Sequence, residues 1–182
     1  LWRLLWSHTA RQIIDRLPSF ARKENFHLFV GQGTQYFVFR DGDWQRVYNF
    51  ALTETEVAEI SAALEKAARE LHYWEESRLA PGDKIIENRG SMVAFSAFGQ
   101  KAGVSEKKAW DPTMEKRAKI AKRAKELAPN FDYQIGGTTT INAFHPGEDK
   151  AFGMAHLMDE LHVERDDILY FGDMTRPGGN DF

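Results

Sequence analysis

Asp173 and Asp181 lie eight residues apart in a glycine-rich segment that follows the apolar run 168–171. The length and bulk of this run predict a buried parallel strand. Carboxylates just beyond such a strand lie where open α/β sheets bind their ligands. Two hard oxygen donors beside flexible backbone suit Mg²⁺, which takes one or two carboxylates and otherwise prefers water and phosphate. Ordinary surface turns also contain Asp and Gly, but the pair favours a magnesium site.

Lys150 is expected to open the helix that precedes this strand. A helix N-terminus attracts anions, and a lysine there adds a mobile point charge suited to phosphate. The alternative is an exposed lysine paired with Glu148 or Asp149. Because Asp173 follows the next predicted strand, the phosphate interpretation is favoured.

Two further segments could bind a phosphate or a sugar. Gly136 and Gly137, followed by three threonines, bring unhindered backbone amides and hydroxyls together. A simple hairpin bend explains this pattern equally well. Arg89 precedes Gly90 between two predicted strands and could bind phosphate bidentately, although a solvated loop arginine gives the same pattern.

The composition sets limits on the function. The 182 residues are 42% hydrophobic and 28% charged, as in an ordinary globular protein. The net charge of -3 provides no overall basic field for nucleic acid. The chain has no cysteine, which excludes thiolate metal sites and a cysteine nucleophile and suits a reducing cytosol. No apolar stretch could span a bilayer, so we expect a cytoplasmic protein without a membrane partner.

The hydrophobic pattern predicts an α+β unit inserted into an α/β core. The expected strands are 26–30, 36–39, 44–48, 84–87, 91–98, 131–135, 138–144 and 168–171, and the expected helices are 13–17, 52–74, 112–127 and 150–161. Residues 50–147 therefore read helix, two strands, helix, two strands, which is typical of an antiparallel sheet covered by helices. Residues 1–49 and 148–182 would form an incomplete Rossmann-like core around this insertion.

Basic residues are concentrated on the helix 113–127 and could form a nucleic-acid patch. They are Lys116, Arg117, Lys119, Lys122, Arg123 and Lys125. They spread around most of the helix circumference, which favours a solvated basic face. A nucleic-acid-binding domain is therefore the lowest-ranked alternative, and we expect no nucleic-acid partner.

Several segments, in order, resemble motifs of the haloacid dehalogenase-like (HAD) superfamily. They are Gly31–Gly33 with Asp41-Gly42, Ile86–Met92 with Phe98–Gln100, Ile135–Asn142, Asp149-Lys150 and Phe171–Asp181. The last two resemble the third and fourth HAD motifs. The insertion resembles the C2-type cap of subfamily IIB, in particular that of eukaryotic-type phosphomannomutases and their bacterial relatives. The resemblance covers about residues 25–182.

This resemblance implies Mg²⁺-dependent phosphoryl transfer on a sugar phosphate, with a hexose phosphate as substrate, through an aspartyl-phosphate. Asp173 and Asp181 would hold Mg²⁺, and Lys150 would neutralise the nucleophile and the transferring phosphoryl group. Arg89 would grip the distal phosphate of the substrate, and Thr140 would touch the substrate. The family often dimerises through the cap, so the resemblance also implies a possible homodimer.

Three cap positions depart from the family pattern. Gln100 and Lys107 stand where phosphomannomutases carry two further arginines, and Asn142 replaces an aspartate that binds sugar. A mutase must hold a bisphosphate intermediate while it reorients, whereas a phosphatase need not. The choice between mutase and phosphatase therefore stays open.

The nucleophile motif of the family, Asp-x-Asp-Gly-Thr, does not occur in these residues. Asp41-Gly42-Asp43 has the wrong order and lies in a predicted hairpin turn, and the second motif could be Ser7 or Thr9. We therefore expect a fragment, cut at both ends, with little or no turnover. A non-catalytic module that binds sugar phosphates is the alternative function.

Overall fold

The computed structural model describes residues 13–172 and 181, and the chain divides into two compact units. Among the described residues, unit 1 contains residues 13–51, the short segment Arg89–Ser91, and Glu148–Tyr170. Unit 2 contains Leu52–Asn88, Met92–Gly147 and residues 171, 172 and 181.

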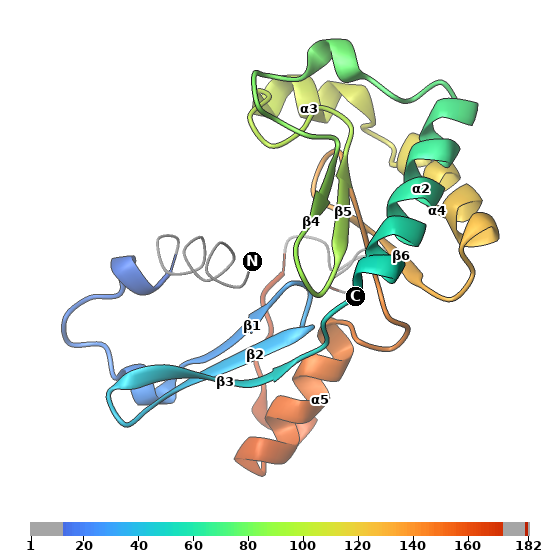
Figure 1. The fold of residues 1–182 in the computed structure, drawn as a ribbon. Coiled ribbons are helices and arrows are strands. Elements are labelled where there is room, and N and C mark those ends of the chain that lie inside the picture. The colour runs from blue at the N-terminus through green and yellow to red at the C-terminus, as the bar shows by residue number, and fades with distance from the viewer. Residues whose placement is uncertain (1–12, 173–180, 182) are drawn as a thin grey trace. The chain divides into compact units, whose positions relative to one another are not determined.

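Unit 1 is built on an antiparallel meander of three strands (Figure 1). The strands are β1 (His27–Val30), β2 (Gln35–Arg40) and β3 (Asp43–Asn49), preceded by 3-10 turns at Ile14–Arg16 and Lys23–Asn25. Asp41 and Gly42 link β2 to β3 with φ angles of 54° and 81°. A two-residue hairpin with both central residues at positive φ matches the twist of its strands, and Asp-Gly suits it best. The predicted hairpin is confirmed.

Helix α5 (Lys150–Leu161) packs on this sheet through aromatic rings. Tyr36 is fully buried; its ring stacks on Phe29 at 4.4 Å and meets the edge of His156 at 5.2 Å. Gly153 makes this close approach possible, because a Cβ at this position would lie 3.0 Å from a ring carbon of Phe29. The bounds of α5 are the predicted ones, and its first residue is Lys150.

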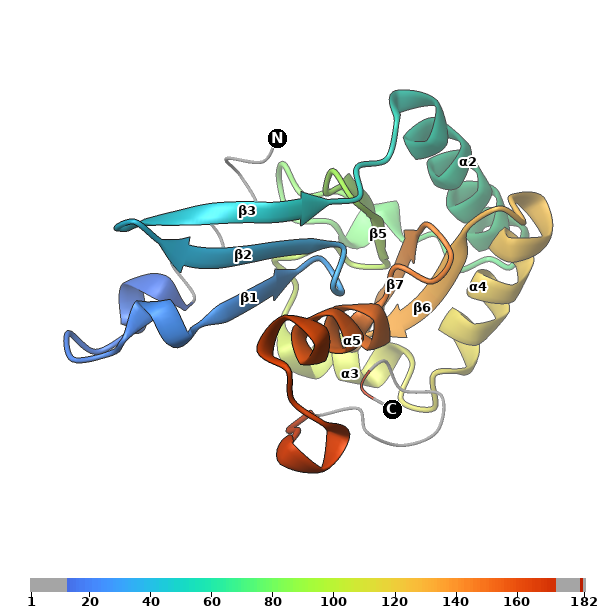
Figure 2. The ribbon, with the colours of Figure 1, turned by 90° about the horizontal axis from the view of Figure 1, so that it is seen from below.

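Unit 2 is a four-stranded antiparallel sheet in the order β4-β5-β7-β6 (Figures 1 and 2). Its strands are β4 (Ile86–Asn88), β5 (Val93–Ser96), β6 (Asp132–Gly136) and β7 (Thr140–Phe144). Helices α2 (Glu54–Glu70) and α4 (Glu115–Leu127) lie side by side on one face, and the short helix α3 (Val104–Trp110) lies between β5 and α4 in the chain. Fully buried Leu64, Phe95, Ile120 and Ile141 join helices and sheet in one core. The predicted α+β insertion with an antiparallel sheet has this form.

A capping box at Thr53 fixes the start of α2. Its hydroxyl accepts the backbone N–H of Glu56, and the Glu56 carboxylate accepts the backbone N–H of Thr53 at 2.7 Å. His145 Nε2 lies 3.0 Å from the same carboxylate. The Thr53 N–H, followed by the His145 bond, lowers the pKa of Glu56 to about 2.

The capping box predicts a specific response to acid. A carboxyl whose folded pKa is depressed contributes stability above its unfolded pKa, and this contribution is lost as pH falls through the folded value. The contribution of Glu56 should therefore disappear between about pH 4.5 and pH 2. Urea midpoints measured across this window should fall more steeply for the wild type than for Glu56→Gln. Equal slopes for the two proteins would contradict the assignment.

Several predicted elements were wrong. Residues 168–171 form no strand, and Leu169 and Phe171 are 78% and 83% exposed. A strand needs a neighbour for its backbone groups, and no residue in the described part of the chain pairs with this run. Residues 13–17 form only the 3-10 turn Ile14–Arg16.

The helix predicted from Pro112 begins later, and the helix before it was missed. Met114 adopts a left-handed conformation, with a φ of 63°, which separates Pro112 from α4. The Asp111 carboxylate instead accepts the backbone N–H groups of Lys116 and Arg117 in the first turn of α4.

Among the helices of residues 13–172, none has the length and apolar character needed to cross a membrane.

Candidate functional site

Lys150 stands at a helix start that is closely packed against the β1–β2 turn. Asp149 caps α5, because its carboxylate accepts the backbone N–H groups of Ala151 and Phe152 at 2.9 and 3.1 Å. Gly33, at a φ of 97°, lies so near that a Cβ there would be 2.5 Å from the Asp149 carbonyl oxygen. Lys150 is partly buried. The turn therefore fixes the backbone that carries the predicted phosphate-binding lysine.

Asp181 is the described member of the predicted metal-binding pair. A Cβ at Gly172 would lie 2.7 Å from Asp181 Cβ and 2.9 Å from its carboxyl carbon. The carboxyl group thus lies against the residue that directly precedes Asp173. Asp173 itself and Ser7 lie outside the described residues. Within the described ranges no group of three or more His, Asp or Glu side chains is arranged for a metal ion, but Mg²⁺ requires only one or two carboxylates. The donor chemistry of Asp181 therefore fits Mg²⁺.

Arg89 lies in the loop that joins β4 to β5, where Asn88 pairs with Val93. It is partly buried and belongs to unit 1, as Lys150 does. The other described candidates, from Gln100 to Asp181, belong to unit 2. Ser91, two residues beyond Arg89, is fully buried and bonded to Thr34 and Gln35.

Gln100 and Lys107 are brought together at the start of α3. Lys107 Nζ donates to the Gln100 carbonyl oxygen at 2.9 Å. The backbone N–H groups of Gln100 and Lys101 both donate to the Asp83 carboxylate, at 3.0 and 2.8 Å. Burial raises the pKa of Asp83, but these N–H donors outweigh it, so the pKa lies below its ordinary value. Asp83 therefore stays ionised and holds the backbone at position 100.

Gly136 and Gly137 are held by a buried arginine that sequence reasoning counted as surface charge. Arg117 Nη1 donates to the carbonyl oxygens of Gly136 and Gly137 at 3.2 and 2.6 Å. Its Nε donates to Asp111 at 2.8 Å, and the two side chains are 3% and 1% exposed. Helix periodicity alone gave no signal for this ion pair, since its two members are separated by the end of one helix and the start of another.

Thr140 and Asn142 share one face of β7, because side chains two residues apart point to the same side of a strand. Thr140 is partly buried, whereas Asn142 is 3% exposed. The Asn142 Oδ1 atom has no hydrogen-bond partner among the described residues. A buried amide oxygen of this kind favours an added donor, such as a sugar hydroxyl.

The basic side chains of α4 mostly contact partners within unit 2. Lys119 pairs with Glu115, Arg123 with Glu70 and Glu126, and Lys125 with Asp132. The Lys116 ammonium lies over the rings of Tyr73 and Trp110. Such pairing leaves the helix with little uncompensated charge for a phosphate backbone.

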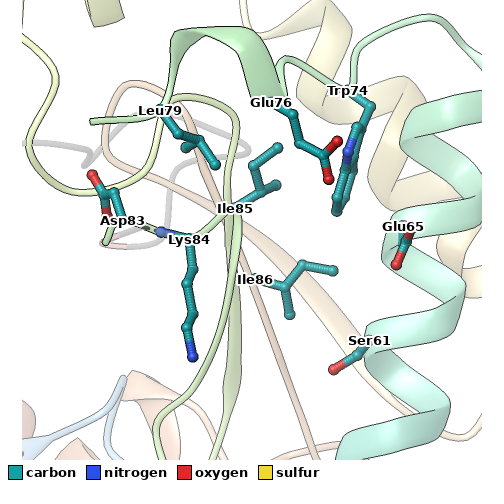
Figure 3. A pocket seen from close by; sticks show the side chains of 9 residues that line it. All are labelled: Ser61, Glu65, Trp74, Glu76, Leu79, Asp83, Lys84, Ile85 and Ile86. Carbon is teal, nitrogen blue, oxygen red and sulfur yellow. Dashed lines mark hydrogen bonds between the residues drawn. The ribbon is translucent and has the colours of Figure 1, made fainter. Parts of the chain in front are cut away.

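A pocket in unit 2 is lined by none of the predicted site residues (Figure 3). Its volume is about 340 Å³, and its lining includes the apolar side chains of Trp74, Leu79, Ile85 and Ile86. Figure 3 shows the Lys84 N–H bonded to the Asp83 carboxylate at its edge. The acids Glu65 and Glu76 are paired with Arg69. The pocket is therefore a surface feature separate from the candidate site.

Comparison with known proteins identifies a family. A family model described as eukaryotic phosphomannomutase matches residues 70–182. The phosphomannomutases of Drosophila melanogaster and Saccharomyces cerevisiae are 32% and 31% identical over 103 and 106 residues, which is 54% of this chain in each case. The matches cover 40% and 39% of these curated relatives, so the chain spans well under half of their length.

A solved structure shows a similar fold. The structure of Plasmodium falciparum IMP-nucleotidase matches the whole of this chain with a TM-score of 0.53. The match covers 43% of the nucleotidase chain. The two sequences are 15% identical. At this identity the likeness concerns the fold alone.

Proposed function

Because the chain belongs to the eukaryotic phosphomannomutase family, within the HAD superfamily, we propose that it serves Mg²⁺-dependent phosphoryl transfer on a hexose phosphate. The observation that carries this proposal is the family match over residues 70–182, which includes every candidate residue from Arg89 to Asp181. The closeness of Gly172 to the Asp181 carboxyl group supports the proposal, because Gly172 directly precedes Asp173, the other predicted metal ligand.

Asp173 and Asp181 would hold the magnesium ion in this proposal, directly or through water. Bound Mg²⁺ would offset negative charge on the phosphoryl oxygens. Lys150, presented at the capped start of α5, would add a second positive charge beside the transferring group. An aspartate carboxylate would attack phosphorus and displace the sugar oxygen, which leaves as the hydroxyl after taking up a proton. Water would then cleave the aspartyl-phosphate and release phosphate, so that one difficult step becomes two easier ones.

The cap would select the substrate. Arg89 would bind the distal phosphate, and Gln100, Lys107, Thr140 and Asn142 would line the inner face together with the Gly136-Gly137 turn. Asn142 supplies a buried oxygen that a sugar hydroxyl can satisfy. With Gln100 and Lys107 as neighbours in place of two arginines, we favour a phosphatase that need not retain a bisphosphate intermediate. In this proposal the protein is cytoplasmic and can form a homodimer through the cap.

The nucleophile motif is not among the 182 residues, so we propose that these residues alone support little or no turnover. Loss of a covalent nucleophile lowers rates by up to about a millionfold in enzymes whose groups act as a unit. The same observation favours the second candidate, a module that binds sugar phosphates without chemistry. Such a module would bind its ligand without Mg²⁺, whereas the enzyme couples the two binding events.

The test is the binding of mannose 1-phosphate by calorimetry with and without Mg²⁺. We expect affinity to rise at least about tenfold with Mg²⁺ and this gain to vanish in Asp181→Asn, because the metal loses a carboxylate ligand. Asp41→Asn, the same chemical change in the β2–β3 turn, should behave as the wild type. Binding that ignores Mg²⁺ would favour the non-catalytic module. Mg²⁺-dependent release of phosphate by the wild-type chain would overturn the expected inactivity.

A further inference from the structure

Three buried polar side chains form a chain of hydrogen bonds behind the loop that carries Arg89. Ser91 and Thr34 are fully buried, and Gln35 is 3% exposed. The Ser91 hydroxyl oxygen lies 2.7 Å from Thr34 Oγ1 and 2.9 Å from Gln35 Nε2. Thr34 Oγ1 also lies 2.6 Å from the carbonyl oxygen of Gly31. All of these residues belong to unit 1.

Counting donors assigns the protons. The Gly31 carbonyl can only accept, so the 2.6 Å contact uses the single hydroxyl proton of Thr34. Ser91 then donates its own proton to Thr34 and accepts from the Gln35 amide. Each hydroxyl proton in the series from Gln35 through Ser91 and Thr34 to Gly31 is used once. Removing the Ser91 hydroxyl takes this acceptor from the buried Gln35 amide, and removing the Thr34 hydroxyl takes the acceptor of the Ser91 proton. Loss of a partner in a buried site costs more than the bond itself contributes.

This series fixes the short loop 89–92 at its centre. The loop begins and ends at the paired residues Asn88 and Val93. Gly90 turns the backbone at a φ of 86°, so that Arg89 and Ser91 lie on either side of the turn. Strand pairing holds the ends of the loop, and the Ser91 hydroxyl holds its middle. Arg89 therefore sits on a backbone restrained at both sides.

We propose that Ser91, with Thr34 and Gln35, positions Arg89 for the distal phosphate of the hexose phosphate. The inference rests on the proposed function, which gives Arg89 that ligand. Ser91 does not touch the substrate; it restrains the backbone from which the guanidinium extends. A guanidinium reads phosphate through two parallel bonds, so its direction matters as much as its charge. Displacement of a binding group by about 1 Å can cost about a hundredfold.

Matched substitutions at position 34 separate the hydroxyl from the shape of the side chain. Thr34→Val keeps the size and removes the hydroxyl, whereas Thr34→Ser keeps the hydroxyl and removes a methyl group. We expect Thr34→Val and Ser91→Ala to bind mannose 1,6-bisphosphate with Mg²⁺ about tenfold to a hundredfold more weakly than the wild type, because this ligand has one phosphate for the Mg²⁺ site and a distal one for Arg89. Thr34→Ser should retain affinity close to that of the wild type.

Inorganic phosphate with Mg²⁺ serves as the second probe. It has no distal phosphate for Arg89, so its affinity should stay unchanged in all of these variants. A general loss of folding would lower the binding of both probes. Should Ser91→Ala fail to fold, the two Thr34 variants still provide the comparison.

Arg89→Ala separates the two levels of the argument. Weaker binding of mannose 1,6-bisphosphate in Arg89→Ala together with unchanged binding in Thr34→Val and Ser91→Ala would overturn the positioning role alone. Unchanged binding in Arg89→Ala would overturn the role of Arg89 in the proposed function, and the positioning role with it. Weaker binding in all three variants, with rescue in Thr34→Ser, supports both.

Discussion

Arg117→Met is expected to lower the free energy of unfolding of unit 2 by about 3–5 kcal/mol, because it leaves the Asp111 carboxylate buried without its counter-ion. The two side chains are 3% and 1% exposed and lie 2.8 Å apart. The substitution also deprives the carbonyl oxygens of Gly136 and Gly137 of their donor. Urea unfolding monitored by circular dichroism measures the loss.

The control is an ion pair on the same helix that lies in water. Lys119 Nζ and the Glu115 carboxylate are 2.6 Å apart, but their side chains are 52% and 68% exposed. Lys119→Met should leave the urea midpoint almost unchanged, since exposed pairs contribute little. Equal shifts in the two variants would show that burial does not determine the effect.

The pH dependence has a defined sign. Burial raises the pKa of Asp111, but Arg117 and the N–H groups of α4 outweigh it and hold the pKa below its ordinary value. The contribution of the pair is therefore present above the unfolded pKa and lost as pH falls through the folded value. The difference in stability between wild type and Arg117→Met should shrink as the solution is acidified.

Gly33→Ala is expected to lower the free energy of unfolding by about 2–5 kcal/mol, since it combines an unfavourable backbone conformation with a steric conflict. The new Cβ would lie 2.5 Å from the carbonyl oxygen of Asp149, and main-chain atoms cannot move aside as the end of a flexible side chain can. Relief of the conflict requires a shift of the first turn of α5. The variant should therefore also bind inorganic phosphate more weakly, through displacement of Lys150.

Gly42→Ala isolates the conformational part of this effect. Gly42 has a φ of 81°, but nothing lies within 4 Å of the position of its Cβ. We expect a loss of about 1–2 kcal/mol from the positive φ alone, with phosphate binding unchanged. Urea unfolding and calorimetry of the two variants give the comparison, and equal losses in both would contradict the proposed contact.

Local signals predicted most of the secondary structure. Asp41-Gly42 marks the hairpin, and the local pattern of residues 150–161 gives the bounds of α5. Each of these depends on residues within a few positions of one another. The run 168–171 failed because a strand also depends on a neighbour that a local pattern cannot supply. The predicted start of α4 was wrong because Met114 adopts a left-handed conformation, which methionine rarely does.

The candidate site was predicted in part. The position of Lys150 at the start of α5 is confirmed, whereas its role and the roles of Arg89, Asn142 and Asp181 stay predictions. The contacts that fix these residues were missed, because they join distant parts of the chain: Gly33 with Asp149, and Thr34 with Ser91. Hydrophobic periodicity carries no information about such pairs. Arg117 was wrongly assigned to the solvated face for the same reason, because its own position in the sequence does not show whether an arginine is buried.

The hold of Asp83 on the loop at position 100 bears on how specificity can diverge. Asp83 bonds the main-chain N–H groups of Gln100 and Lys101, while the Gln100 side chain is exposed. The bonds that hold the loop therefore do not depend on which side chain is present at position 100. Substitutions at position 100 can therefore change the chemical group that a ligand meets without loss of the bonds that hold the loop. Related proteins can differ at this position and keep the same loop conformation.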